Sequence, residues 1–212
     1  MARQASSART VTARNPAREG KYQQILEAAI QVISERGFYQ ARVAEIAESA
    51  GVADGTVYLY FENKEQILMA AIDSAFDRFL ERARAELAGE LEPREQLRRL
   101  ARLHLQSLGE HRSLALLFQT ELRQSARFLS QFSHRRLIEY FDLIRAAIRQ
   151  GQTSGVFRTD IPEKIAANCF FGALDEMVTS WVLSEHDYAL GGAADAIVDL
   201  ILIGMESRPG RG

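Results

Sequence analysis

Scarce residue types exclude several classes of protein before any motif is considered. The 212-residue chain has one cysteine, four prolines and a formal net charge of only −2. A single cysteine cannot form an internal disulfide, and apolar neighbours predict that Cys169 is a buried structural thiol. The N-terminus has no apolar run, and no stretch approaches the roughly 18 consecutive apolar residues of a membrane span. We therefore expect a cytoplasmic protein with neither a signal peptide nor a contact with membranes.

Charge is distributed in blocks that the small net charge conceals. Residues 1–21 carry five basic and one acidic side chain, and residues 93–150 carry eleven arginines and five acids. By contrast, residues 65–92 carry three basic and seven acidic side chains, and residues 151–212 carry four and nine. A DNA-binding surface near the N-terminus would account for the first basic block only.

The segment RVAEIAESAGVADGTVYLYF, residues 42–61, predicts a helix, a tight turn and a second helix. Gly51 breaks the first helical pattern and can adopt the left-handed backbone that such a turn requires. This spacing is typical of a DNA-reading helix-turn-helix, and an ordinary corner of a helical core is the alternative. Short polar and aromatic residues on the outward side of the second helix favour DNA. The predicted DNA-binding residues are Arg42, Asp54, Gly55, Thr56, Tyr58, Tyr60 and Lys64.

Helical periodicity continues through the rest of the chain, and no alternating strand pattern interrupts it. One helix is predicted before the motif, from Tyr22 to Gly37, and six after it, at 64–88, 93–108, 113–125, 127–150, 162–183 and 193–205. We therefore predict an all-α fold in which residues 21–63 form a three-helix DNA-binding head and residues 64–206 form a six-helix bundle. Residues 1–20 are predicted to be a mobile basic arm, which lies along DNA or is a solvated tail, and residues 207–212 a tail.

The last two predicted helices carry apolar residues on more than one face. Such helices pack against more than one neighbour. A four-helix contact with a second copy of the chain would cover this surface, and an intrachain core alone is the alternative.

The segment GVADGTVYLYFENKEQIL, residues 51–68, resembles the TetR family of one-component transcription regulators, and the resemblance extends over nearly the whole chain. It implies a head that binds double-stranded palindromic operator DNA and a bundle that binds a small-molecule ligand. It also implies a homodimer formed through the last two helices. The chain departs from the family pattern at Ala53, where many members have serine, and at Arg42, where small hydroxyl residues are common.

Two segments of the C-terminal half resemble a narrower group, the fatty-acid degradation regulators of that family. They are LFQTELRQS, residues 117–125, and FGALDEMVTSWV, residues 171–182. Regulators of this group release DNA when they bind a long-chain acyl-coenzyme A (acyl-CoA). The resemblance implies a repressor of fatty-acid degradation genes that needs no cofactor and responds to acyl-CoA as its effector.

An acyl-CoA requires an apolar tunnel that opens onto cations, because a long hydrocarbon chain is joined to a phosphate-bearing head. Candidates for the tunnel are Leu117, Phe118, Phe128, Phe132, Phe141, Phe171 and Trp181, and candidates for its mouth are Arg102, Arg112, Arg123, Arg135 and Arg136. Ordinary core packing and solvated helix faces are the alternatives. Glu121 and Asp175 either line the polar floor of the pocket or pair with neighbours such as Arg123, Thr120 and Thr179.

Two other functions compete with this reading. An enzyme is the first, but His104 and His111 stand seven residues apart, whereas metal ligands on one helix converge at spacings of three or four. Neither a Gly-rich phosphate loop nor a nucleophile elbow occurs. The second is a multidrug-efflux repressor of the same family. Pockets of that kind bind lipophilic cations through acidic residues, whereas the middle of this ligand half is basic.

Overall fold

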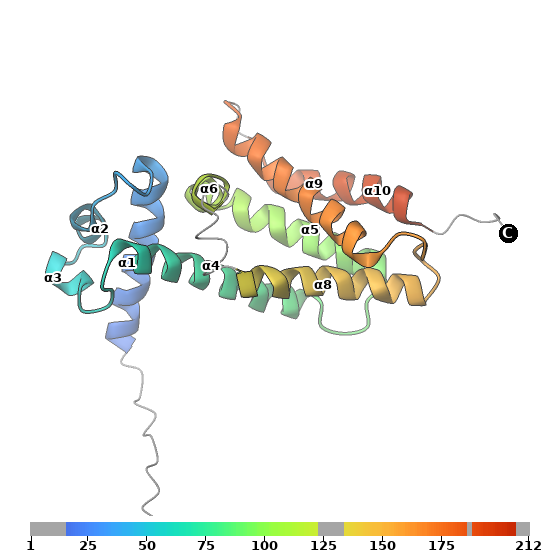
Figure 1. The fold of residues 1–212 in the computed structure, drawn as a ribbon, viewed down its shortest axis with the longest axis horizontal. Coiled ribbons are helices and arrows are strands. Elements are labelled where there is room, and N and C mark those ends of the chain that lie inside the picture. The colour runs from blue at the N-terminus through green and yellow to red at the C-terminus, as the bar shows by residue number, and fades with distance from the viewer. Residues whose placement is uncertain (1–15, 123–133, 186–187, 207–212) are drawn as a thin grey trace, which may run out of the picture.

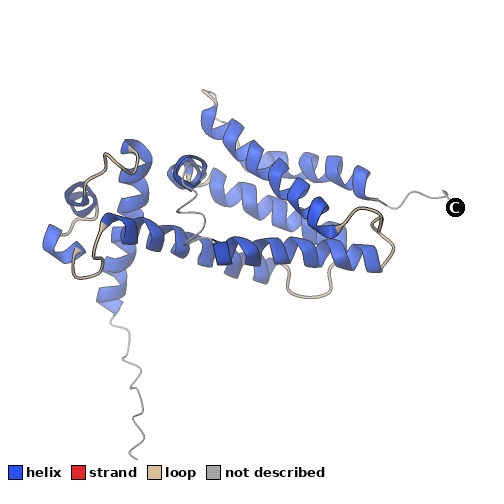
Figure 2. Cartoon of the chain, viewed as in Figure 1, coloured by secondary structure: helices blue, strands red, loops and turns tan. Residues whose placement is uncertain are grey.

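A computed structural model describes residues 16–122, 134–185 and 188–206, and no strand occurs in these ranges (Figure 2). The prediction of an all-α fold is confirmed, with three helices before α4 and six from α4 onward in the described residues. The helices are α1 (Pro16–Arg36), α2 (Val43–Ser49), α3 (Asp54–Val57), α4 (Lys64–Glu86), α5 (Pro93–Gly109), α6 (Arg112–Leu117), α8 (His134–Thr153), α9 (Glu163–Leu183) and α10 (Ala194–Met205), with a π-helical turn η1 (Phe118–Leu122) and a 3-10 turn η2 (Leu190–Ala193).

The first three helices and the beginning of α4 share one apolar core at the end of the molecule opposite the C-terminus (Figure 1). Ile25, Ala29 and Ile33 lie on one face of α1 at helical spacing, and all three are buried. Burial of such a stripe is the main source of stability for a helix of this length.

The turn between α2 and α3 depends on small residues. Gly51 has a φ of 66°, in the left-handed region that residues with a side chain avoid. The N–H of Val52 donates to the carbonyl of Ala47 at 3.0 Å, which directs the chain back across α2. Ala47 and Val57 are completely buried where the two helices cross. The predicted helix-turn-helix is therefore present.

α4 belongs to both halves of the molecule. Asn63 caps its N-terminus, because its side chain accepts a hydrogen bond from the N–H of Gln66 at 2.9 Å. Ile67, in the first half of α4, is part of the head core, whereas Leu80 and Ala83 are part of a second core in the bundle. α4 is therefore a continuous helix shared by the two cores.

The second core lies between α5, α8, α9 and α10, with the later part of α4 beside it (Figure 1). Ion pairs join these helices at the surface. Arg149 of α8 binds Glu163 of α9 at 2.6 and 2.7 Å, and Arg136 of α8 binds Asp77 of α4 at 2.6 and 2.8 Å. The basic block of the sequence thus pairs with the acidic blocks on either side of it, through contacts between different helices.

Several boundaries differ from the prediction. α1 begins at Pro16, so residues 16–20 of the predicted arm are helical, and α6 ends at Leu117, where the π-helical turn begins. The predicted burial of Cys169 is wrong, because this thiol lies on the exposed face of α9 while Phe170 next to it is buried. No helix in the described part of the chain is long and apolar enough to cross a membrane.

Candidate DNA-binding face and ligand cavity

The outward face of the helix-turn-helix is polar and open. Asp54 and Gly55 are exposed, Thr56 is half-buried and Tyr58 is 57% exposed. Tyr58 lies in the turn after α3 rather than on the helix, because α3 is a single helical turn. A Cβ added at Gly55 would meet no atom within 4 Å, so the packing of the head itself does not require glycine at this position. Glycine would be required at this position if a binding partner approached the backbone closely.

The starts of α2 and α3 lack the usual side-chain caps. Arg42 is the N-cap residue of α2, and its own N–H donates to a carboxylate oxygen of Glu45 at 2.9 Å. This contact leaves the side chain of Arg42 exposed beside the head. Ala53 is the N-cap residue of α3 and offers no side-chain acceptor, and Asp54 lies within the first turn instead of capping it.

Two of the predicted DNA-binding side chains make contacts within the head. The ammonium group of Lys64 donates to the carbonyls of Ala41 at 2.7 Å and Tyr39 at 3.3 Å, and it lies 4.6 Å from the ring centroid of Phe38. The hydroxyl of Tyr60 donates to the carbonyl of Arg18 at 3.3 Å. These contacts tie the α1–α2 loop to α4 and the start of α1 to the turn after α3.

A cavity of about 390 Å³ lies where α4 passes the bundle, within the volume range typical of small-molecule sites. Half of its lining residues are apolar, and α4, α5, α6, η1, α8 and α9 all contribute to it. The lining consists of Ala75, Phe76, Arg78, Phe79, Arg82, His104, Ser107, Leu108, His111, Leu114, Phe118, Gln119, Leu137, Tyr140, Phe171 and Asp175.

One wall of the cavity is a hydrogen-bonded amide and carboxylate. The side-chain amide of Gln119 donates to Asp175 at 2.8 Å, and the hydroxyl of Thr179 donates to the Gln119 side-chain oxygen at 3.1 Å. Because a partly buried carboxylate needs donors, this arrangement lets Asp175 lie in a largely apolar wall. Gln119 is a partner of Asp175 that the sequence did not suggest, while the hydroxyl of Thr120 donates to the carbonyl of Leu116 at 2.8 Å and Arg123 lies outside the described residues.

His104 is buried in the wall between α5 and α8. Its Nδ1 lies 3.1 Å from the hydroxyl of Tyr140, and the ring of Phe171 approaches it edge-on at 5.8 Å between centroids. Burial lowers the pKa of His104 to about 4, against a smaller opposite effect of Asp175. Burial also raises the pKa of the Tyr140 hydroxyl. Both groups are therefore neutral at physiological pH.

Three of the predicted ligand-binding residues line this cavity: Phe118, Phe171 and Asp175. Phe141 packs against Phe171, with centroids 4.9 Å apart, but does not line the cavity. Leu117 is completely buried in the head core. Arg123, Phe128 and Phe132 lie outside the described residues, as does the side chain of Glu121.

Trp181 lies in the bundle core rather than at the cavity. Its indole N–H donates to the carbonyl of Tyr188 at 2.9 Å. The guanidinium of Arg112 lies 4.8 Å from the centroid of its ring and donates to the carbonyl of Val182 at 2.9 Å. The contacts of Arg112 thus link the start of α6 to the end of α9.

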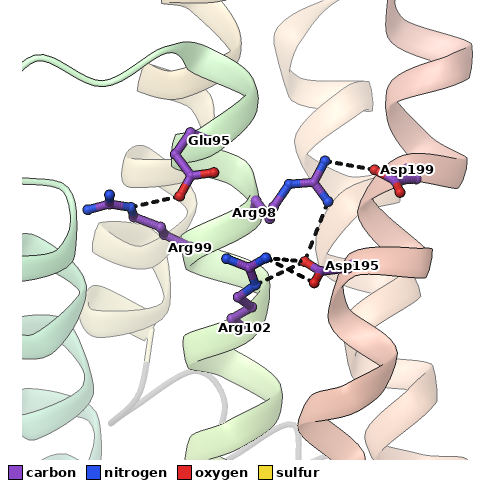
Figure 3. Close-up of polar contacts among 6 residues, drawn as sticks. All are labelled: Glu95, Arg98, Arg99, Arg102, Asp195 and Asp199. Atoms are coloured by element: carbon purple, nitrogen blue, oxygen red, sulfur yellow. Dashed lines mark hydrogen bonds and ion pairs between the residues drawn. The ribbon is translucent and has the colours of Figure 1, made fainter.

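Arg102 does not line the cavity either. It joins α5 to α10 by donating to both carboxylate oxygens of Asp195 at 2.9 Å (Figure 3). Arg98, one turn earlier, donates to Asp199 at 2.7 Å and to Asp195 at 3.4 Å. Arg102 also borders a second hollow, of about 380 Å³, together with Arg99.

The cations that do line the cavity were missed by sequence reasoning. Arg78 and Arg82 extend from α4, within the block that is acidic overall, and no carboxylate partner of either occurs in the described part of the chain. Arg78 donates to the hydroxyl of Ser74 at 2.8 Å, and Arg82 to that of Ser107 at 3.4 Å. Their spacing from Ala75 and Phe79, at three and four residues, places all four on one face of α4. This helical spacing relative to apolar residues of α4 could have identified the two arginines from the sequence.

A helix-turn-helix head joined by one helix to a bundle with an internal cavity is the architecture of a DNA-binding transcription regulator. Two family profiles match the chain: bacterial regulatory proteins of the tetR family over residues 25–71, and the C-terminal region of YsiA-like protein over residues 72–204. The chain belongs to the TetR family. Members of this family are DNA-binding regulators, so the enzyme alternative is excluded. No group of three side chains suited to a metal ion occurs among the described residues.

Similarity to individual proteins extends over most of the chain. The fatty acid metabolism regulator protein of Bacillus subtilis (strain 168) is 35% identical over 89% of this chain and 97% of its own length. The crystal structure of a transcriptional regulator FadR from Bacillus subtilis in complex with stearoyl-CoA matches with a TM-score of 0.81, 35% identity and coverage of 86% and 98%. The fatty acid degradation regulator FadR from Bacillus halodurans matches with a TM-score of 0.80, 37% identity and the same coverage. The predicted resemblance to fatty-acid regulators of the TetR family is confirmed.

Proposed function

We propose that the protein is a homodimeric repressor of fatty-acid degradation genes, which a long-chain acyl-CoA releases from its operator. The observation that carries this proposal is a cavity with both apolar and cationic lining beside α4, in a chain 35% identical to a fatty acid metabolism regulator. A structure that matches with a TM-score of 0.81 is that of a regulator in complex with stearoyl-CoA. No resident cofactor is required by this function, and the site of action is the cytoplasm, where the operator is.

The chemistry of the cavity supports an acyl chain as ligand. Phe76, Phe79, Leu108 and Phe118 offer the apolar contacts that a hydrocarbon requires. Arg78 and Arg82 offer charge to an anionic end. A lipophilic cation, the ligand expected of a multidrug-efflux repressor, would be repelled by these two arginines and would have Asp175 alone among carboxylates in the described lining. The acyl-CoA is therefore the better match.

Operator binding is assigned to the outward face of the head, residues 21–63. Gly55 and Thr56 approach base edges in the major groove, and Tyr58 and Arg42 contact phosphates, because these four residues of the helix-turn-helix are exposed or half-buried. Asp54, Tyr60 and Lys64 support the same face, the last two through their bonds within the head. In a dimer the two heads would enter successive major grooves, about 34–36 Å apart.

The dimer is assigned to α9 and α10. Large apolar side chains that project from these helices are exposed in the single chain, with Leu183 at 77%, Leu200 at 74% and Ile203 at 75%. Surfaces of this kind mark protein contacts. The bundle, residues 64–206, would then carry both the ligand site and the dimer contact.

Ligand binding would reach the head by two routes. The first is α4, which belongs to both cores. The second is α6, where Leu114 lines the cavity and Leu117 is buried in the head core, while Ser113 donates to Gln31 of α1 at 2.8 Å. An acyl-CoA that prefers one arrangement of these helices would change operator affinity by a typical factor of about 5–150.

The test is a titration of operator-bound protein with palmitoyl-CoA and, in parallel, with free CoA and with a lipophilic cation. Palmitoyl-CoA is expected to release a palindromic operator fragment, measured by fluorescence anisotropy, and the other two to leave it bound. Release by the cation but not by palmitoyl-CoA would reverse the assignment in favour of the multidrug type.

A further inference from the structure

Arg82 belongs to two adjoining hollows. On one side it lines the apolar cavity, and on the other it lines the second hollow of about 380 Å³. Six of the seven residues that line this second hollow are polar or charged. It is bordered by Arg82, Glu86, Glu95, Arg99, Arg102, Leu103 and Gln106.

The two hollows follow one another along the groove between α4 and α5. Arg82 of α4 contacts Ser107 of α5, and Arg99 of α5 donates to the carbonyl of Glu86 in the last turn of α4 at 3.0 Å. The two helices are therefore antiparallel. The apolar cavity occupies the end of the groove toward the head, and the polar hollow occupies the end away from it.

The polar hollow has unused hydrogen-bond donors. Within the described residues, Arg82 donates only to a serine hydroxyl, and Arg99 only through Nε and one Nη. Among the same residues, Arg102 donates only through Nε and one Nη, to Asp195 (Figure 3). A guanidinium carries five N–H groups, so each of the three retains donors. Three cations and two carboxylates border the hollow. Arg99 holds Glu95 at 3.0 Å, and Arg102 is paired at 2.9 Å with Asp195, which lies outside the lining, so Arg82 is the cation without a carboxylate partner among the described residues.

We propose that the polar hollow is an anion subsite for the phosphate groups of the ligand, so that the ligand lies along the groove with its hydrocarbon tail toward the head. This inference rests on the proposed function and assigns the direction of the ligand. Bidentate contact with phosphate is what guanidinium groups favour. The end of the tail then meets Phe76 and Phe118, which pack against the head core. Tail length would thus decide how strongly the ligand acts on DNA binding.

The experiment compares palmitoyl-CoA with S-palmitoyl pantetheine, which has the same tail and thioester but no phosphate. Dissociation constants are measured for the wild-type protein and for Arg82→Gln, Arg99→Gln and Arg98→Gln. Arg98 is the matched control, because it neighbours Arg99 on α5 but pairs with Asp199 and does not border the hollow. Arg82→Gln and Arg99→Gln are expected to weaken palmitoyl-CoA about tenfold each and to leave the pantetheine ester unchanged. Arg98→Gln should leave the dissociation constants of both ligands unchanged.

The outcomes separate the subsite from the function. If the wild-type protein prefers palmitoyl-CoA and both variants keep the full preference, the subsite is elsewhere and this inference is wrong, while the proposed function stands. An equal loss in Arg98→Gln would also overturn it, because the effect would then be one of general charge. Failure of the wild-type protein to bind palmitoyl-CoA would remove the proposed function itself. A thermal melt will show whether Arg99→Gln is folded. If it is not, the comparison of Arg82→Gln with the charge-retaining variant Arg82→Lys tests the inference by itself.

Discussion

The ring of Phe118 meets the ring of Phe76 edge to face, with centroids 5.2 Å apart, and both rings line the cavity while packing against the head core. One comes from η1 and the other from α4. A ligand that fills the cavity at this end must touch the same two side chains that support the DNA-binding head. Packed side chains such as Phe76 and Phe118 have few alternative arrangements, so a change in packing on the cavity side changes the packing on the head side.

Replacement of Phe118 by alanine should therefore uncouple the two functions. We expect the ratio of operator affinities without and with palmitoyl-CoA to fall from the typical range of about 5–150 toward one, because the ligand can no longer press on the head. Operator titrations by anisotropy measure this ratio. Phe141→Ala is the control, since Phe141 contacts Phe171 on the bundle side, and a ratio preserved in Phe118→Ala would contradict this role.

Two glycines of the helix-turn-helix should respond oppositely to alanine. Gly51→Ala places a side chain at a φ of 66° and should cost about 1–2 kcal/mol of unfolding free energy. Gly55→Ala meets no atom within 4 Å and should stabilise α3 slightly, by at most about 1 kcal/mol. It should nevertheless weaken operator binding, because a methyl group then stands on the DNA-facing side. Urea unfolding and operator titrations separate the two effects, and unaltered affinity in Gly55→Ala would argue against that face.

Arg42 and Lys64 should differ in the same two measurements. Arg42 is exposed, so Arg42→Ala should leave the melting temperature unchanged and reduce the slope of log affinity against log salt by about 0.9 for each lost phosphate contact. Lys64→Met removes two hydrogen bonds to the α1–α2 loop and should cost about 1–2 kcal/mol of stability. If Lys64→Met melts like the wild type and changes only the salt slope, its ammonium group acts on DNA instead.

The pKa of His104, lowered by burial to about 4, predicts how stability depends on pH. Between about pH 4 and the ordinary histidine pKa of about 6.5, the unfolded chain binds a proton that the folded protein does not. Stability is therefore fully present above pH 6.5 and falls as pH decreases toward 4, by about 3 kcal/mol in total. His104→Gln should remove this part of the pH dependence. Parallel pH profiles in the two proteins would show that His104 does not titrate in this window.

Leu200 offers a test of the proposed dimer. Leu200→Glu places a charge on the exposed apolar face of α10 and should shift the protein to monomers in analytical ultracentrifugation, with operator affinity reduced accordingly. Ile138→Glu, at an exposed position on α8 that is not assigned to the dimer, should remain dimeric. A dimer that persists in Leu200→Glu would place the contact on another surface.

Local patterns predicted most of the fold. The helices follow apolar residues at spacings of three and four, and Gly51 and Asn63 mark a turn and a cap whose geometry depends on neighbouring residues only. The end of α6 at Leu117 was not predictable, because that residue leaves the bundle to enter the head core. The exposure of Cys169 was not predictable either. An apolar sequence does not distinguish a face buried within one chain from a face that remains open on it.

The ligand site was harder to predict than the fold. The excess of arginines in residues 93–150 suggested a mouth for an anion, yet Arg136 and Arg149 are bound to acids from other segments. Pairing between distant segments depends on the tertiary arrangement, and a count of charges contains no information about it. A charge count also hid Arg78 and Arg82, because the segment that contains them is acidic overall.

The cross-helix pairing of Arg136 and Arg149 has a consequence for encounters with the chromosome. A guanidinium held against a carboxylate projects little electrostatic field into solution, so Arg136 and Arg149 add little to the attraction of a polyanion. Residues 21–63 carry three basic and six acidic side chains, whereas residues 1–20 carry four arginines and one acid. Long-range attraction to a polyanion therefore depends on the N-terminal segment more than on the paired arginines of the bundle.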